Sequence, residues 1–192
     1  RPVILGPVTW LKLAKSKDAG LDPLSLLPAV LPVYVALLEE LAAAGAQWVQ
    51  IDEPCLVTDL DEEARRALRQ AYDHLTKAVP AVRIMLASYF GGLGDNAATA
   101  LALPVAGLHL DLIRAPAQLA DIVARARGDQ VLSLGVIDGR NIWRADLVSI
   151  LDRIEPTVAA LGRSRVEIAP SCSLLHVPID LDLETKLDPD LK

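Results

Sequence analysis

Acidic side chains stand at the end of the run Gln50-Ile51-Asp52-Glu53-Pro54, which has the pattern of a strand closed by a proline. Gln50 and Asp52 lie on one face of such a strand. Two carboxylates at the carboxyl end of a strand can orient a ligand amine, bind a metal ion or act as acid and base. The alternative is structural, because the same carboxylates can pair with arginines of neighbouring loops. Asp52 and Glu53 are therefore the first candidate site residues.

A second candidate pair comes from the alternating run at residues 107–112, Gly-Leu-His-Leu-Asp-Leu. If its three leucines pack on helices, His109 and Asp111 point to the opposite face, with Asp111 nearer the end of the strand. A buried charge requires a partner. We expect His109 to be a structural, hydrogen-bonded residue, whereas Asp111 could belong to a site or to the scaffold.

Polar residues also follow two later apolar runs. Asp138 and Arg140 follow one of them, and Arg140 could neutralise a carboxylate or clamp an anionic substrate. Cys172 and His176 follow the other, and such a pair could supply a nucleophile or half of a zinc site. No H-E-x-x-H or C-x-x-C motif accompanies them, so this pair alone indicates little. The candidate substrate-binding residues are Asp52, Glu53, Asp111, Asp138, Arg140 and Cys172.

Short apolar runs that alternate with longer amphipathic ones must position these residues. Expected strands cover residues 3–10, 48–53, 83–88, 107–113, 131–138 and 165–171. Expected helices cover residues 24–44, 61–78, 95–102, 116–127 and 145–161. Strict alternation predicts parallel strands with right-handed crossovers, in an open doubly wound sheet or a barrel.

The missing phosphate loop favours the barrel. No G-x-G-x-x-G follows the first strand and no G-x-x-x-x-G-K-[ST] occurs. Polar strand ends that converge on one mouth are typical of a (β/α)8 TIM barrel. Strand starts recur about every 32 residues, so eight units need roughly 260 residues, near the usual barrel length of about 250. We expect residues 1–192 to be one domain, the carboxy-terminal part of an incomplete α/β barrel with strands three to eight, the first two βα units preceding Arg1.

The composition of the chain argues against several classes of protein and of binding partner. Of 192 residues, 52% are apolar and 23% charged, which excludes a disordered chain. The formal net charge of −6 repels nucleic acid and anionic membrane surfaces. The longest uncharged apolar stretch, residues 24–38, is shorter than the roughly 18 residues of a membrane span. Two cysteines give no disulfide framework, so a cytoplasmic location is expected.

Several strings together resemble the amino-terminal domain of cobalamin-independent methionine synthase. They occur in order at residues 6–9 (GPVT), 49–54 (VQIDEP), 107–112 (GLHLDL), 138–147 (DGRNIWRADL) and 171–176 (SCSLLH). The resemblance implies a zinc-dependent S-methyltransferase of two (β/α)8 barrels related by duplication. That enzyme makes methionine by moving a methyl group from 5-methyltetrahydropteroyl-polyglutamate to homocysteine, which its zinc activates as a thiolate.

The resemblance also implies that this barrel is not the catalytic one. The family's zinc site belongs to its carboxy-terminal barrel, and the equivalent positions here are Leu86, Ser88, Asp111 and Cys172. Leu86 cannot bind zinc and Ser88 binds it poorly. The family's proton-donating histidine falls near Arg140, which stays charged at neutral pH. We therefore expect no catalytic residue, metal ligand or cofactor in this chain.

As a partner, the resemblance implies the carboxy-terminal catalytic barrel of the same polypeptide, with folate polyglutamate and homocysteine as the ligands of the whole enzyme. The chain would support folate binding and the catalytic barrel. The basic residues of the polyglutamate site precede this chain in the family, so none is assigned here.

Two alternatives stay open. One is a stand-alone enzyme of a related barrel superfamily, a decarboxylase or methyltransferase that uses Asp52, Asp111 and Cys172. The other is a purely structural docking module. In either case a six-stranded remnant leaves two unpaired strand edges, and we expect it to self-associate through them.

Overall fold

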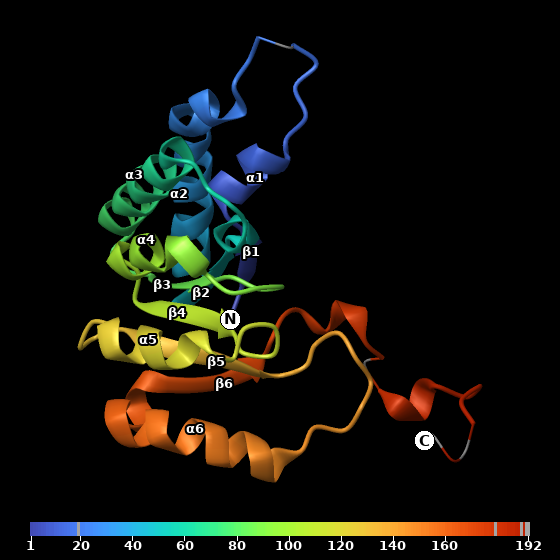
Figure 1. Ribbon diagram of the computed structural model, residues 1–192. Coiled ribbons are helices and arrows are strands. Elements are labelled where there is room, and N and C mark those ends of the chain that lie inside the picture. Colours follow the sequence, from blue (N-terminus) through green and yellow to red (C-terminus); the bar gives the residue numbers. More distant parts are fainter. Residues whose placement is uncertain (19, 179, 189, 191–192) are drawn as a thin grey trace.

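A computed structural model describes residues 1–18, 20–178, 180–188 and 190. Its centre is one sheet of six parallel strands that lie side by side in chain order (Figure 1). The strands are β1 (Val3–Leu5), β2 (Trp48–Asp52), β3 (Arg83–Ala87), β4 (Gly107–Asp111), β5 (Val131–Ile137) and β6 (Val166–Pro170). The expected α/β class with parallel strands is confirmed.

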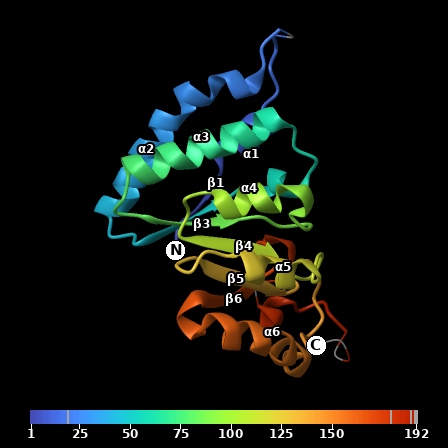
Figure 2. The same cartoon turned by 60° about the vertical axis from the view of Figure 1, so that its left-hand side comes forward.

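Helices connect consecutive strands, and α2 to α6 cover one face of the sheet (Figures 1 and 2). The α-helices are α1 (Pro7–Leu13), α2 (Leu27–Ala43), α3 (Glu62–Ala78), α4 (Ala97–Ala102), α5 (Gln118–Arg125) and α6 (Leu147–Leu161). Short 3-10 turns are η1 (Pro23–Leu26), η2 (Pro54–Val57), η3 (Gly94–Asn96), η4 (Arg163–Arg165), η5 (Leu174–His176) and η6 (Leu181–Leu183). All five expected helices are present, with ends that differ by a few residues.

The first expected strand is wrong in its second half. The strand ends at Leu5, and α1 begins at Pro7. Proline suits a first helical position because its φ is already helical and its missing N–H would have had no partner there. The N–H groups of Val8 and Thr9 find an acceptor in the Glu53 carboxylate, a contact between segments far apart in the sequence. The apolar pattern alone could not show that contact.

The strand register gives the two faces of the sheet different chemistry. Ile51, Leu86 and Leu108 are fully buried in the apolar core beneath the helices. Residues one step along each strand, such as Gln50 and His109, point to the opposite face. The leucines of the 107–112 run all join the helix-side core, as the alternation predicted.

The strands at the two edges of the sheet are not paired with each other. β1 pairs only with β2 and β6 only with β5 among the described residues. The edges nevertheless face one another across the inner side, because Arg1 Nη2 lies 2.5 Å from Glu167 Oε2. The sheet is therefore curved as in a barrel that is open between β1 and β6.

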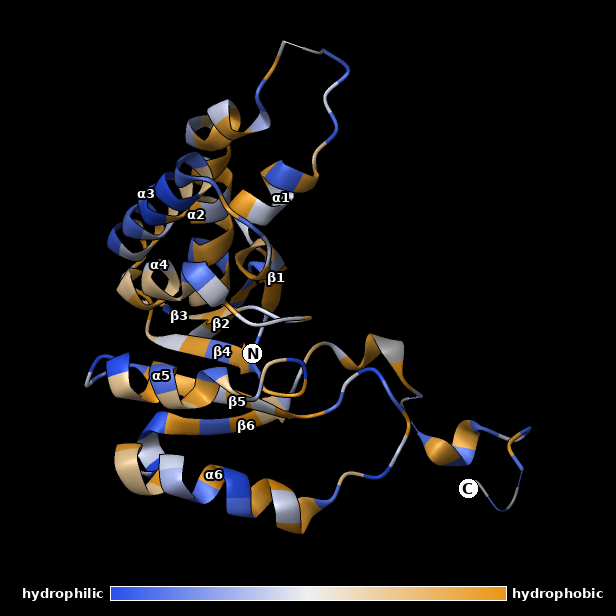
Figure 3. Cartoon of the chain, viewed as in Figure 1, coloured by the Kyte–Doolittle hydropathy of each residue, from blue (hydrophilic) through white to orange (hydrophobic). Residues whose placement is uncertain are grey.

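The helix layer is uneven in character. α3 is mostly hydrophilic, with an apolar stripe turned to the core, whereas α2 is apolar over most of its surface (Figure 3). The stretch Pro23–Ala43 is long and apolar enough to cross a membrane by length and composition alone, with mean hydropathy 1.7. A single such helix is weak evidence of a span, and α2 packs against α1 and α3.

Candidate functional site

The concave face of the open sheet encloses a cavity of about 560 Å³. Its polar lining comes from Gln50 and Asp52 on β2, Tyr89 after β3, His109 on β4 and Cys172 after β6. Its apolar wall comes from the two edge strands and the segment after β6, with Val3, Leu5, Ala169, Pro170, Leu174 and Leu175. Two candidates from the sequence, Asp52 and Cys172, thus share one cavity.

Asp52 is the anion of this cavity. Gln50 Nε2 donates to its Oδ1 at 2.8 Å, and the Tyr89 hydroxyl donates to its Oδ2 at 3.1 Å. No ion pair involves Asp52 in the described part of the chain. Burial raises the pKa of Asp52, and the two hydrogen bonds oppose that shift. Burial and the nearby carboxylate also raise the pKa of Tyr89, so the hydroxyl remains a donor.

His109 is the structural residue that the sequence predicted. Its Nδ1 lies 2.9 Å from Ser133 Oγ and its Nε2 lies 3.3 Å from the Ser171 carbonyl oxygen. Ser133 is the direct partner of His109 in the β4–β5 register. Burial lowers the pKa of His109, which favours the neutral ring. Gly135 permits the approach, since a Cβ there would come within 2.9 Å of the imidazole Cε1.

The Asp111 carboxylate accepts hydrogen bonds from backbone N–H groups of the loops at the mouth, and it is not among the residues that line the cavity. Its Oδ1 accepts from the N–H groups of Ile113 and Arg114 at 3.0 and 2.8 Å, and its Oδ2 accepts from Phe90 N–H at 2.9 Å. Phe90 has φ of 73°, an unusual conformation for a bulky residue, and the Asp111 carboxylate helps to fix it. Three backbone donors thus already use the carboxylate, which supports the scaffold interpretation.

Asp138 and Arg140 lie in the loop after β5, outside the cavity. Asp138 accepts from Arg140 N–H and from Asn141 Nδ2, which orders the loop. The Arg140 guanidinium lies over the Phe90 ring, 5.0 Å from its centroid. Arg140 therefore joins two mouth loops, and no ion pair links it to a candidate carboxylate among the described residues.

Cys172 is a buried free thiol beside the same loop. A Cβ on Gly139 would lie 2.9 Å from its Sγ, so that glycine is needed for the close approach. Burial raises the pKa of the Cys172 thiol, and the carboxylates of Asp111 and Asp138 add to the shift. A thiol with these neighbours is a poor nucleophile at neutral pH. The side chain of His176 lies outside the described part of the structure.

Glu53 was expected at the mouth, and the structure places it elsewhere. The side chain is fully buried on the helix side. Oε1 accepts from Val8 N–H at 3.1 Å and from the Tyr72 hydroxyl at 3.2 Å, and Oε2 accepts from Thr9 N–H at 2.7 Å. Desolvation raises the pKa of Glu53. Because no solvent reaches it, its role is to anchor α1 to β2 and α3, and the expected place at the mouth is wrong.

The zinc-site positions implied by the family do not form a metal centre here. Leu86 faces the helix layer, so its side chain would miss the cavity whatever its type. Ser88 is buried, and Asp111 is occupied by backbone donors. No group of three or more His, Cys, Asp or Glu side chains could hold a metal ion within the described residues. These residues do not fit zinc.

Sequence reasoning missed Tyr89, the residue that orients Asp52 from the neighbouring strand. The available signal was its position two residues after the end of β3, near the end of β2 in a parallel sheet. The pairing of Asp52 with Ala87 brings the next residues of β3 to the mouth. A polar aromatic residue at a strand's carboxyl end is as strong a mouth candidate as a carboxylate.

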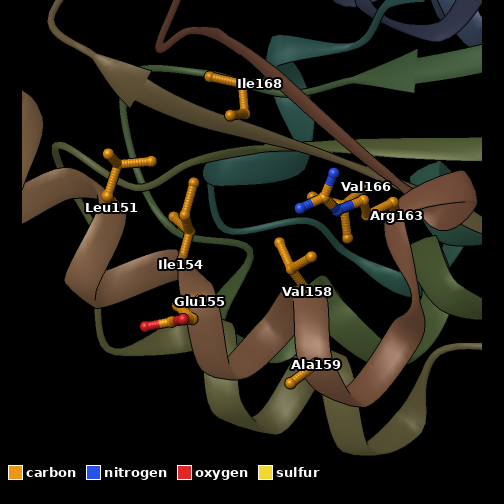
Figure 4. Close-up of a pocket in the computed structure, with 8 residues that line it drawn as sticks. All are labelled: Leu151, Ile154, Glu155, Val158, Ala159, Arg163, Val166 and Ile168. Atoms are coloured by element: carbon orange, nitrogen blue, oxygen red, sulfur yellow. The ribbon is translucent and has the colours of Figure 1, made fainter.

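A second hollow of about 600 Å³ lies on the outer side, between α6 and β6 (Figure 4). Ile154, Val158 and Ile168 supply apolar walls, and Glu155 and Arg163 are its charged residues. Ile168 is 58% exposed although it lies in a strand. This groove marks an uncovered part of the helix layer.

Comparison with known proteins gives one family. Residues 1–162 match the family model described as "Cobalamin-independent synthase, N-terminal domain". The chain is 66% identical over all 192 residues to the 5-methyltetrahydropteroyltriglutamate–homocysteine methyltransferases of Nitrobacter winogradskyi and Caulobacter vibrioides, and covers 25% of each. It thus spans about a quarter of the length of these curated relatives.

Solved structures agree on the fold. A putative vitamin-B12 independent methionine synthase from Listeria monocytogenes superposes with a TM-score of 0.68 at 20% identity, over 91% of this chain and 57% of that one. A B12-independent methionine synthase from Shewanella sp. W3-18-1, in complex with selenomethionine, gives 0.69 at 13% identity, over 92% and 56%. The six-stranded open sheet is therefore a known barrel-type arrangement.

Proposed function

The chain belongs to the family of the N-terminal domain of cobalamin-independent synthase, and from this premise we propose that it is the non-catalytic partner barrel of a methionine-forming methyltransferase. The whole enzyme would transfer a methyl group from 5-methyltetrahydropteroyl-polyglutamate to homocysteine. The observation that carries the proposal is the identity of 66% along the entire chain with proteins named for this reaction. The resemblance read from the motifs is confirmed at the level of the family.

The geometry of the mouth favours a structural role for this barrel over a catalytic one. Asp111 is occupied by three backbone N–H groups, and the raised pKa of Cys172 opposes a thiolate. Arg140 packs on Phe90 between two loops. These residues build a fixed rim on which a second domain could rest. We propose that the partner is a carboxy-terminal catalytic barrel of the same polypeptide, and that zinc is held there.

The uncovered edges support the further proposal that the chain is part of a (β/α)8 barrel completed by two more βα units. Among the described residues, neither edge strand has a partner on its outer side, and both outer helices expose apolar side chains. Val33 on α2 is 66% exposed and Val148 on α6 is 69% exposed. The groove between α6 and β6 is the space that a neighbouring helix would fill. Parallel sheets are normally covered and continuous, so these faces fit missing neighbours.

Self-association is the expected behaviour of the isolated chain, because open edges and apolar faces pair with each other. Light scattering of the 192-residue chain should show species larger than a monomer. A monodisperse, cooperatively melting monomer would contradict the incomplete-barrel proposal. We also propose a cytoplasmic location, supported by the two free cysteines and the relatives' biosynthetic names.

A domain exchange tests the function. The chain replaces the matching quarter of the Nitrobacter winogradskyi relative, and methionine formation is assayed with 5-methyltetrahydropteroyl-triglutamate and homocysteine. We expect the exchanged protein to be active with zinc bound, and the 192-residue chain alone to be inactive and zinc-free. Methyl transfer by the chain alone would overturn the non-catalytic role. A folded but inactive exchanged protein would overturn the supporting role.

A further inference from the structure

The carboxylate of Asp52 borders a cavity, and no Lys or Arg side chain forms an ion pair with it among the described residues. Its two hydrogen-bond partners among the described residues, Gln50 and Tyr89, are neutral donors, one on each oxygen. His109 shares the cavity, but burial favours its neutral form. A carboxylate taken partly out of water is costly without an opposite charge. The cavity is therefore electrostatically incomplete on the evidence of its described lining residues.

The hydrogen bonds orient Asp52 without saturating it. A carboxylate has about four acceptor directions, and Gln50 and Tyr89 use two of them. The Tyr89 hydroxyl oxygen, while donating to Asp52, can itself accept a hydrogen bond. A group with three N–H donors could therefore bond both Asp52 and Tyr89 from within the cavity.

The remaining lining decides what kind of cation fits. Most of the other wall is aliphatic, from Val3, Leu5, Ala169 and Pro170 among others. A calcium ion needs six to eight oxygen ligands, and this site offers one carboxylate. A quaternary ammonium is bound by a cage of Trp, Tyr or Phe rings, and Tyr89 is the single side chain of these types in the described lining. An alkyl chain that ends in a primary ammonium matches both the charge and the wall.

We propose that the inner cavity is a binding site for a small primary alkylammonium compound, with Asp52 as its counter-ion, Tyr89 as a second contact and the edge-strand aliphatic residues around its carbon chain. The volume of about 560 Å³ lies within the range of ligand sites in proteins, roughly 300 to 1,000 Å³. Tyr89 and Cys172 follow the ends of β3 and β6, so the cavity reaches the carboxyl-end mouth of the sheet, where a ligand can enter.

The test titrates the 192-residue chain with n-butylammonium chloride and, in parallel, with butan-1-ol, at constant ionic strength and two protein concentrations. Binding is followed by the NMR shifts of the backbone amides. The wild type should bind the ammonium compound at least about tenfold more tightly than the alcohol. A hydrogen bond to a charged group changes the dissociation constant by about that factor or more. Equal affinity for the two compounds would overturn the proposal, and that comparison needs no variant.

Two substitutions and a control locate the site. Asp52→Asn keeps the shape and should weaken butylammonium binding at least about tenfold, with little change for butanol. Ala169→Leu fills the cavity and should abolish binding of both compounds. Asp59→Asn removes an exposed carboxylate outside the cavity lining and should leave both affinities unchanged. Undiminished ammonium binding by folded Asp52→Asn, or by folded Ala169→Leu, would show that the cation binds elsewhere.

Discussion

Asp52 and Glu53 are neighbours in the sequence and belong to two different regions of the molecule. Asp52 faces the inner cavity, half-buried, with two neutral donors and open space beside it. Glu53 turns to the helix side, where it is fully buried and accepts from α1 and α3. The first is a carboxylate with spare capacity, whereas the second is committed to holding three elements together.

The difference between the two carboxylates shows that burial alone does not make a residue part of a binding site. Burial raises the pKa of both residues. What separates them is the place of the unused acceptor directions, which lie in a cavity for Asp52 and are closed off by protein for Glu53. A buried carboxylate that organises backbone N–H groups is structural, and one that borders a cavity without a cation is available for a ligand.

The largest loss of stability is expected from Glu53→Ala. Two backbone N–H groups at the start of α1 and the Tyr72 hydroxyl would lose their buried acceptor. We expect the free energy of unfolding to fall by about 3 kcal/mol or more, measured by urea denaturation. The control is Glu155→Ala on the exposed side of α6, expected within about 0.5 kcal/mol of wild type. Equal midpoints for the two variants would contradict the anchoring role.

A smaller loss of stability is expected from Gly6→Ala, because the added methyl group crowds the same carboxylate. A Cβ at residue 6 would lie 2.2 Å from the Glu53 carboxyl carbon. Relieving that overlap should cost about 1 to 3 kcal/mol. Gly128→Ala is the matched control, because nothing lies within 4 Å of its added methyl group. If thermal melting shows the same midpoint for both variants, the packing around Glu53 is looser than the structure indicates.

The free energy of unfolding, measured over a range of pH, tests the burial of Glu53. Because burial raises the pKa of Glu53, the folded chain keeps this proton at a pH where the unfolded chain has lost it. The resulting stabilisation is present below the ordinary carboxyl pKa and is lost as pH rises through the folded value, so the free energy of unfolding falls across that window. The lowered pKa of His109 gives the opposite slope up to its ordinary value.

Glu53→Gln isolates the glutamate contribution, because glutamine does not titrate while His109 and Asp52 are retained. The difference in urea midpoint between wild type and this variant should shrink as pH rises through the window. Parallel profiles for the two proteins would show that Glu53 titrates alike in the folded and unfolded chains.

The smallest effect is expected for the stability of Asp52→Asn. The asparagine side chain keeps its shape, and its amide oxygen can still accept from one of Gln50 or Tyr89. We expect a change of less than about 1 kcal/mol in the free energy of unfolding, in either direction, by urea denaturation. A loss as large as that of Glu53→Ala would place Asp52 in the scaffold and remove the distinction between the two carboxylates.

Much of the fold was readable from local patterns. The alternating run at 107–112 correctly separated the leucines that face the helices from His109 and Asp111. The helix expected over residues 61–78 is α3, and Asp61 at its start caps it, with its carboxylate accepting from Ala64 N–H. These features depend on residues a few positions apart, so the sequence contains the whole interaction.

The errors arose where a distant segment decides the conformation. Residues 7–10 are apolar enough for a strand, yet they form α1 because a carboxylate more than 40 residues away accepts from its first N–H groups. Leu86, which the family resemblance places at a metal-ligand position, has its side chain in the core on the helix side, where the β3 register turns it. Tyr89 was overlooked because its partner Asp52 lies on another strand.

By itself, the sequence determined the α/β class, the order of strands and helices, the family and the set of polar residues at the strand ends. These follow from the hydrophobic periodicity, from the residues that begin and end helices and strands, and from short motifs, all of which are local properties of the chain. Only the tertiary structure decided which carboxylate of the Asp52–Glu53 pair meets the cavity and which is sealed against α1. The physical reason is that the fate of a charged group depends on the donors and the empty space around it, and distant segments supply both.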